Sequence, residues 1–346
     1  MKTVLALAAW VALSAQSPPP ATTPAGRAAM QEALGQALQG DMRPALARLR
    51  ATPDDQFAGP GAAIRTCVLA RFGGAPNDGP VTGLPPATAR ALTLYRTYWR
   101  AGLLDPAARP AAGERLRTGL AALLGLPAAT TLDAMEAPLA TQLEAEHMHV
   151  LFGVTPPFRE LMLWRGQTEE QRDVALPEGA HRIRVFMLDD FISLGWAGYA
   201  TCERNHTGGW VRPEGIYAVR SGWGDLAGEA FQVSFLAHET QHFADKERFG
   251  ELPSRELEYR AKLAEFALAQ TSQARLLEAF TSSQSDDQAL PHPYANRRVL
   301  AALRTRLGLA ADAPFTGATP DAIRAAARAE LLADSAHRRP IASQAR

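Results

Sequence analysis

The sequence predicts an α+β fold, with a front half built only of helices and a back half that mixes strands with helices. Two observations predict it. Between residues 25 and 152 apolar side chains recur at helical spacing. Between residues 173 and 219 short runs of strand-forming residues are separated by turns that contain Gly and Pro, and helical spacing returns after residue 231. With 346 residues the chain is long enough for one large domain or two ordinary ones.

The composition is typical of a globular protein, with 47% apolar and 21% charged residues. The formal net charge is zero. A chain without excess positive charge offers no general attraction to phosphate backbones or to anionic lipid surfaces. We therefore expect neither nucleic acid nor a membrane surface as a partner.

The N-terminus has the pattern of a signal peptide. Lys2 supplies a short positive region, residues 4–12 form an apolar run, and the small residues Ser14 and Ala15 suit cleavage, which predicts a signal peptide over residues 1–15. Residues 16–24 are rich in Pro and predict an extended linker. The apolar run is too short to cross a bilayer, and no later stretch reaches the required length of about 18 residues. We expect a periplasmic or secreted protein without a membrane span once the signal is removed.

The chain contains two cysteines, Cys67 and Cys202. In an oxidising compartment they could form one disulfide that ties the front half to the back half. Two buried free thiols are the alternative. Neither cysteine has the spacing of a zinc site.

Residues 25–152 predict an antiparallel array of helices. Tyr95, Tyr98 and Trp99 are expected in its core rather than on a binding surface. This half of the chain carries no pattern that discloses a function. The helical segments are expected at residues 25–49, 62–72, 87–103, 111–124 and 132–152.

Residues 153–334 predict a second domain, because the Gly- and Pro-containing stretch 153–157 marks a boundary and the composition changes after it. A short amphipathic element is expected at 158–164, and strands at 173–176, 181–188 and 215–219. Asp189 and Asp190 are interpreted as solvated acids at the end of a strand rather than as a metal site. Two more helical segments are expected at 295–307 and 321–333, followed by a frayed tail over residues 335–346.

The most informative stretch is a pentad that reads H-E-x-x-H, from His238 through Glu239 to His242. Side chains four residues apart lie one above the other on a helix, so the two imidazoles could share one metal ion. Glu239 lies about 100° further round the helix, where it cannot easily join them as a ligand but can reach a water beside the metal. The pattern predicts a zinc hydrolase with Glu239 as the general base.

A catalytic zinc usually takes three protein ligands, so a third must come from another element. Glu258 is the favoured residue, because it lies in the first turns of the next predicted helix, 255–281, which can return over the histidine pair. Glu256 would point about 160° away from Glu258 on that helix. Glu265 shares the face of Glu258 but lies two turns deeper. Glu256 and Glu265 remain the alternatives.

The donor that stabilises an oxyanion is left open between His206, Tyr217 and Tyr259. The other histidines lack a partner at useful spacing and are interpreted as structural. They are His147, His149, His181, His292 and His337.

Residues 231–265 resemble the gluzincin branch of the zincin metallopeptidases, in which one helix carries H-E-x-x-H and the next carries E-x-x-A. Here Glu258 and Ala261 match that second pattern. The resemblance implies a mixed sheet packed on the motif helix, with substrate lying along an edge strand. The chain departs from the pattern at Lys262, where some gluzincins have an Asp that contacts a zinc-ligand histidine. Asp245, one turn after His242, is the residue expected to hold an imidazole N–H instead.

The sequence therefore predicts an exported zinc metallopeptidase in which residues 153–334 form a zincin-like domain. One zinc ion is expected on His238, His242 and Glu258, with a peptide or protein as substrate. Two alternatives remain open. The first is a catalytically silent binding module in which zinc only stabilises the fold and the helical half grips a partner. The second is a zinc amidase that acts on cell-wall peptides.

Overall fold

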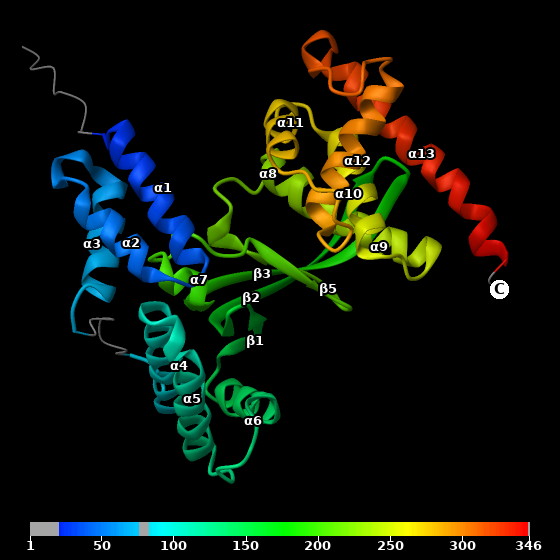
Figure 1. The fold of residues 1–346 in the computed structure, drawn as a ribbon. Helices are drawn as coiled ribbons and strands as arrows, with labels where there is room; N and C mark the ends of the chain where they lie inside the picture. Colours follow the sequence, from blue (N-terminus) through cyan, green and yellow to red (C-terminus); the bar gives the residue numbers. More distant parts are fainter. Residues whose placement is uncertain (1–20, 76–82, 345–346) are drawn as a thin grey trace, which may run out of the picture. The chain divides into compact units, whose positions relative to one another are not determined.

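The computed structural model describes residues 21–75 and 83–344, with side chains as far as residue 338. The predicted signal peptide, residues 1–15, lies outside the described residues, as does most of the predicted linker, 16–24. The α+β class is confirmed (Figure 1). The chain divides into two compact units, the first formed by Met1–Leu163 with Ser193–His206 and the second by Trp164–Ile192 with Thr207–Arg346.

The helices of the first unit follow the predicted order, with differences where the backbone must turn. The segment predicted as one helix over 25–49 is two helices, because Gly40 has φ +85°, a conformation that glycine adopts without strain, and Asp41 then caps the second helix. Tyr95, Tyr98 and Trp99 are buried, as predicted. The helices are α1 (Pro24–Leu38), α2 (Met42–Ala51), α3 (Gly59–Phe72), α4 (Pro86–Leu104), α5 (Arg109–Leu124), α6 (Leu132–Ala145) and α7 (Gly195–Ala200), with short 3₁₀ turns η1 (Asp54–Gln56) and η2 (Pro106–Ala108).

Five strands form one mixed sheet in the order β1-β2-β3-β5-β4. β3 pairs parallel with β5, aligning Val185 with Ile216, and β4 pairs antiparallel with β5, aligning Trp210 with Tyr217. β4 therefore lies at one edge of the sheet. The strands are β1 (His149–Thr155), β2 (Phe158–Leu176), β3 (Gly179–Leu194), β4 (Gly209–Arg212) and β5 (Gly215–Val219).

Two of these strands are much longer than predicted. The amphipathic element expected at 158–164 and the strand expected at 173–176 are parts of one strand, β2, which a two-residue turn joins to β3. The stretch between them, residues 165–172, is almost entirely polar, so it lacks the alternation that identifies a strand in sequence. The end of the helix predicted over 132–152 is strand β1.

The second unit continues from β5 into the helices that carry the motif. α10 packs against α9, α12 and α13 (Figure 1). The predicted frayed tail is wrong, because α13 continues to Gln344 and Ser335 within it is buried. The elements are η3 (Arg220–Gly222), α8 (Glu229–Phe231), the π-helical turn η4 (Gln232–Ala237), α9 (His238–Phe249), α10 (Ser254–Leu268), α11 (Gln273–Ser282), α12 (Pro291–Arg306), η5 (Phe315–Gly317) and α13 (Pro320–Gln344).

The helix predicted over 255–281 is divided into α10 and α11 by a bend at Ala269, whose backbone is extended. The next three backbone N–H groups, of Gln270, Thr271 and Ser272, donate hydrogen bonds of 2.9–3.1 Å to the carboxylate of Glu229. These groups are thus satisfied by a distant side chain rather than by helix carbonyls, which explains the break.

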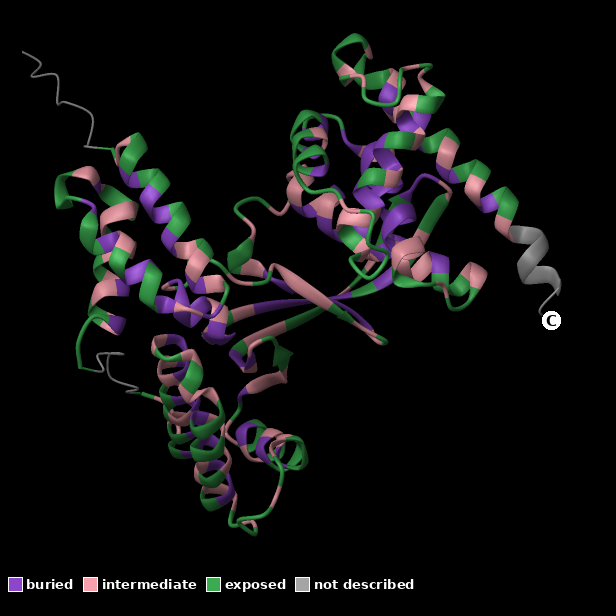
Figure 2. Ribbon diagram, viewed as in Figure 1, coloured by how far each residue is buried: buried purple, intermediate pink, exposed green. Residues whose placement is uncertain are grey.

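Two apolar clusters hold the second unit together. One joins Val185, Ile216 and other residues of a sheet face to Phe231 and Phe235 of the segment that precedes the motif. The other lies among α10, α11, α12 and α13 and contains Leu263 of α10 and other fully buried residues. Figure 2 shows these buried residues along the facing sides of the helices. The motif helix is therefore held between a sheet face and a helical core.

Cys67 and Cys202 form a disulfide. Both residues belong to the first unit, because Ser193–His206 is part of it. The bond therefore does not tie the front half to the half that carries the motif, as the sequence suggested. The reason is that the chain leaves the second unit along β3 and returns to it only at Thr207.

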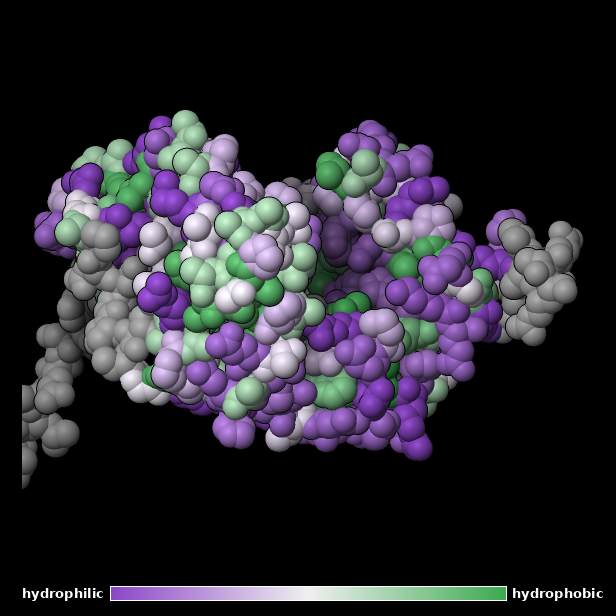
Figure 3. Space-filling model, turned by 90° about the horizontal axis from the view of Figure 1, so that it is seen from below, coloured by the Kyte–Doolittle hydropathy of each residue, from purple (hydrophilic) through white to green (hydrophobic). Residues whose placement is uncertain are grey.

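Within the described residues, no helix combines the length and the apolar character needed to cross a bilayer. On the face shown in Figure 3, apolar side chains occur in small groups among hydrophilic ones.

Candidate metal centre

The two motif histidines are placed by the helix that begins at His238. η4 precedes it without a break, and π-helical turns of this kind are found frequently at functional sites. His238 is the first residue of α9, and His242 lies one turn later on the same face. The two rings are 4.8 Å apart and nearly perpendicular.

Glu258 reaches the histidine pair from α10, which packs against α9. Its Oε2 lies 3.5 Å from His238 Nε2 and its Oε1 lies 3.5 Å from His242 Nε2. All three side chains are at least 88% buried, with exposed fractions of 9–12%. The structure thus brings together the three residues that the sequence proposed as ligands.

The spacing of these atoms fits a metal ion. Ligand atoms about 2.0–2.1 Å from a tetrahedral zinc lie about 3.4 Å from one another, and each imidazole Nε2 lies 3.5 Å from one of the two oxygens of Glu258. One ligand atom from each of His238, His242 and Glu258 lies within 4.8 Å of the other two. Two imidazoles and a carboxylate are also the donor set of many catalytic zinc sites. The grouping could therefore bind a metal ion through three protein ligands.

A second carboxylate orients the first histidine. Glu265, two turns after Glu258 on α10, lies 2.6 Å from His238 Nδ1 and is buried. Because an ionised carboxylate only accepts hydrogen bonds, Nδ1 donates its proton to Glu265, and Nε2 is the ring atom that faces Glu258 and is available to a metal ion. A metal-binding histidine is commonly fixed in this way by an acid behind it.

The electrostatics of the grouping are dominated by these carboxylates. Burial alone would lower the pKa of His238, but Glu265 and Glu258 raise it to about 10. Burial likewise raises the pKa of Glu258, but the neighbouring imidazoles of His238, His242 and His292 outweigh it and hold that pKa well below its usual range. Glu258 is therefore ionised at neutral pH and attracts positive charge.

Glu239 follows His238 on α9 and is partly buried. Among the described residues its carboxylate makes neither a hydrogen bond nor an ion pair. A carboxylate that is not engaged by a cation or a donor can accept a proton from water. Its position on the helix, beside the histidines but not in line with them, is the one that the sequence predicted.

The other acids considered from the sequence have different roles. Glu256 points away from the histidines and contacts Arg298 and Arg338. Glu265 is not in the grouping of ligand atoms, but its carboxylate contacts Nδ1 of His238. The prediction that Asp245 holds an imidazole is wrong, because its carboxylate accepts hydrogen bonds from Gln241 and Arg260 instead.

The two tyrosines predicted as oxyanion donors have other partners in the structure. The hydroxyl of Tyr217 donates to Glu214, and that of Tyr259 donates to Glu330. His206 belongs to the first unit. The residue that sequence reasoning missed is His292, interpreted as structural, whose Nδ1 lies 2.8 Å from Glu258 Oε2. No local spacing signals it, because it lies on another helix far along the chain.

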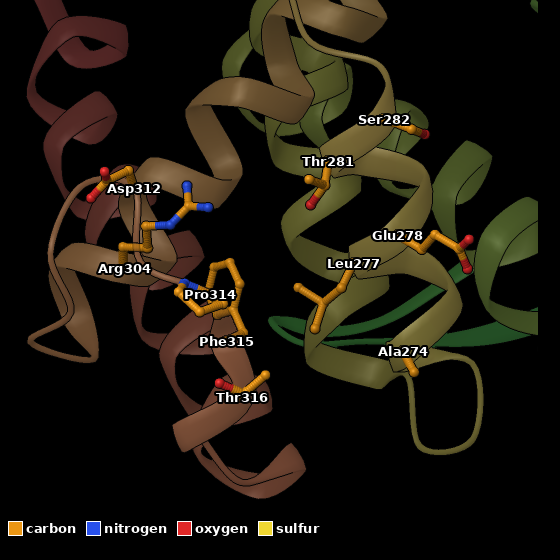
Figure 4. Close-up of a pocket in the computed structure, with 10 residues that line it drawn as sticks. All are labelled: Ala274, Leu277, Glu278, Thr281, Ser282, Arg304, Asp312, Pro314, Phe315 and Thr316. Carbon is orange, nitrogen blue, oxygen red and sulfur yellow. The ribbon is translucent and has the colours of Figure 1, made fainter.

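A separate pocket of about 630 Å³ lies between α11 and the segment that joins α12 to α13 (Figure 4). Leu277 and Phe315 face one another across it, and the guanidinium of Arg304 lies over the ring of Phe315. None of the residues that line it belongs to the grouping on α9 and α10. It is therefore a distinct feature of the second unit.

The fold and the grouping together define an α+β protein with a site of two histidines and one glutamate that could hold a metal ion. No protein-family model, curated protein or solved structure matches the chain.

Proposed function

We propose that the chain is an exported zinc metallopeptidase of the gluzincin type. The observation that supports this most is the convergence of His238, His242 and Glu258, from two consecutive helices, with ligand atoms within 4.8 Å of one another. The unengaged carboxylate of Glu239 beside them is the second support. The residues fit zinc better than calcium or magnesium, which prefer ligand sets made only of oxygen.

The zincin-like assignment of the second unit is part of this proposal. Supporting it are a mixed sheet that packs on the segment leading into the motif helix, and an acid supplied by the following helix. β4, at the edge of the sheet, offers unpaired backbone groups on its outer side to an extended peptide. Such pairing would hold a peptide by its backbone, with little demand on its sequence.

The proposed reaction is hydrolysis of a peptide bond. A bound zinc ion supplies Lewis-acid chemistry, polarising the carbonyl and making a water acidic enough to attack at neutral pH. Glu239 accepts the proton of the attacking water and delivers it to the leaving amine. His238 and His242 would hold the ion from α9, and Glu265 keeps the ring of His238 in its observed orientation.

Export is supported by the disulfide between Cys67 and Cys202, since disulfides persist mainly in oxidising compartments such as the periplasm or the extracellular space. The signal-peptide pattern of residues 1–15 points in the same direction. We therefore propose a periplasmic or secreted location.

The variant Glu239→Gln tests this function. We expect the purified protein to hold one zinc ion, and the variant to keep that zinc while its peptidase rate falls by about 10²–10⁴-fold, the usual contribution of a general base. The measurement combines metal analysis with turnover of a casein-like protein, short peptides and peptidoglycan fragments. Glu247→Gln, an exposed acid on the same helix, is the matched control and should retain full activity.

Each other result points to a different function. Stoichiometric zinc without turnover of any substrate would favour the silent binding module. Turnover confined to peptidoglycan fragments would favour the cell-wall amidase. Protein without bound zinc, or a Glu239→Gln variant with undiminished activity, would contradict the proposal.

A further inference from the structure

His292 stands at the solvent side of the metal grouping. It is the second residue of α12, its side chain is 68% exposed, and its Nδ1 lies 2.8 Å from Oε2 of Glu258, which is only 11% exposed. An exposed ion pair adds little to the stability of a fold. The contact is therefore not required to hold the second unit together. Its main effect falls on the carboxylate of Glu258.

The backbone around His292 is fixed even though its ring is exposed. Pro291 and Pro293 flank it and restrict the chain on both sides. The N–H of Ser285 donates to the carbonyl of Pro293, and the side chain of Asn296 donates to the carbonyl of Ser283. The start of α12 is thus anchored to the loop that precedes it, which fixes the backbone from which the His292 ring projects.

α12 is in turn fixed against the helix that carries Glu258. Arg298 donates to Glu256 of α10 over 2.8 Å, and its guanidinium lies 4.1 Å from the centre of the Tyr259 ring. Val299 and Leu300 are fully buried in the cluster shared with α10. The packing of two rigid helices therefore sets the separation between His292 and Glu258.

The two oxygens of Glu258 have different surroundings. Oε1 faces His242, whereas Oε2 faces both His238 and His292. The last torsion of a glutamate side chain has a broad energy minimum, so a free carboxylate rotates easily. A polar group 2.8 Å from one oxygen restricts that rotation and keeps the carboxylate plane turned toward the two imidazoles.

We propose that His292 is a positioning residue whose Nδ1, 2.8 Å from Oε2 of Glu258, holds the carboxylate in the orientation that binds the metal ion. His292 does not belong to the grouping of ligand atoms, so it acts through Glu258 rather than as a ligand. The proposal rests on the proposed function only in assuming that the grouping binds zinc. It assigns a role to a residue that no local motif marks.

The test measures zinc affinity rather than activity. Wild-type protein, His292→Ala, His292→Asn and His337→Ala compete for zinc with a chromophoric chelator. We expect His292→Ala to bind zinc about 10–100-fold more weakly, the usual effect of removing a group that orients a ligand. His292→Asn should recover most of the affinity, since its amide nitrogen takes the place of Nδ1. His337 is exposed on α13 and is the control, for which no change is expected.

Urea denaturation of the metal-free proteins separates this role from a structural one, and all four should share one midpoint. Equal zinc affinity in wild type and His292→Ala would overturn the positioning role while leaving the proposed function intact. An Asn variant as weak as the Ala variant would overturn the polar contact with Oε2 as its cause. A wild-type protein that binds no zinc would overturn both the proposed function and this inference.

Discussion

α9 and α10 each contribute to two buried polar clusters that differ in how negative charge is balanced. In the first, the carboxylates of Glu258 and Glu265 meet only imidazoles. In the second, the fully buried guanidinium of Arg260 contacts Glu178, Asp245 and Asp334 at 2.6–2.8 Å. Two further arginines, Arg248 and Arg338, contact Glu178 and Asp334 respectively.

The difference separates a structural cluster from a candidate metal site. In the second cluster three guanidinium groups face three carboxylates, so the charges balance within the chain. In the first cluster, as far as the described residues show, neither carboxylate contacts a guanidinium or an ammonium group. Carboxylates buried beside imidazoles attract a cation, whereas carboxylates already paired with arginine do not. The same two helices thus supply a cluster whose charges are paired within the chain and a second cluster that is suited to a metal ion.

The largest expected effect comes from removing the buried arginine of the second cluster. Arg260→Met should lower the free energy of unfolding by about 3–5 kcal/mol, because it leaves buried carboxylates without a partner. Urea denaturation of the metal-free protein measures this loss. Arg182→Met is the control, since Arg182 pairs with Asp173 on the surface and its loss should leave stability nearly unchanged. Equal, small losses in both variants would show that Arg260 does not have the structural role assigned to it.

A smaller effect is expected from changing the acid that contacts Nδ1 of His238 in the first cluster. Glu265→Gln should weaken zinc binding by about 10–100-fold, because the charge that orients and polarises His238 is removed. Chelator competition measures the affinity. Glu256→Gln alters an acid on the same helix that contacts only arginines, and it should bind zinc as wild type does. If the two variants lose affinity equally, the special role of Glu265 is refuted.

The smallest effect concerns a carboxylate balanced in a third way, by backbone N–H groups. Burial opposes ionisation of Glu229, but hydrogen bonds from Ser272, Thr271 and Gln270 lower its pKa from 4.5 to about 2. Glu229→Ala should cost about 1 kcal/mol at pH 7, similar to the loss of a helix cap.

The pH dependence of that loss has a definite sign. The folded pKa is depressed, so the stabilisation is complete above pH 4.5 and is lost as the pH falls toward 2. The difference in urea midpoint between wild type and Glu229→Ala should therefore shrink between pH 4.5 and 3. A difference that stays constant over that range would show that the carboxylate charge is not what matters.

The part of the site that lies within one helix, or on consecutive helices, could be predicted from the sequence. The spacing of His238 and His242 follows from helix geometry, and Glu258 was preferred because α10 returns over α9. Glu265 was considered for the wrong role, since its contact with His238 Nδ1 depends on the rotation of α10 about its own axis. Asp245 was misassigned because sequence spacing does not show that Arg260 lies beside it.

His292 could not be predicted, because its contact with Glu258 depends on how α12 packs against α10. The long strands were missed for a related reason. Residues 165–172 of β2 are polar, and their pairing within the sheet, rather than their own pattern, makes them a strand. Features fixed by local periodicity were thus accessible from the sequence, and features fixed by distant partners were not.

The π-helical turn before His238 affects how this helix tolerates the insertion or deletion of a residue in evolution. A turn that bonds from residue i to i+5 accommodates one residue more than an α-helical turn. Residues upstream of Gln232 can therefore be repacked against the sheet in a different register without rotating His238 and His242 on α9. Removing one residue from Gln232–Ala237 would convert the segment to regular α-helix and turn the apolar side of Phe231 away from the sheet. The histidines would then remain, but the packing of the preceding segment on the sheet face would be lost.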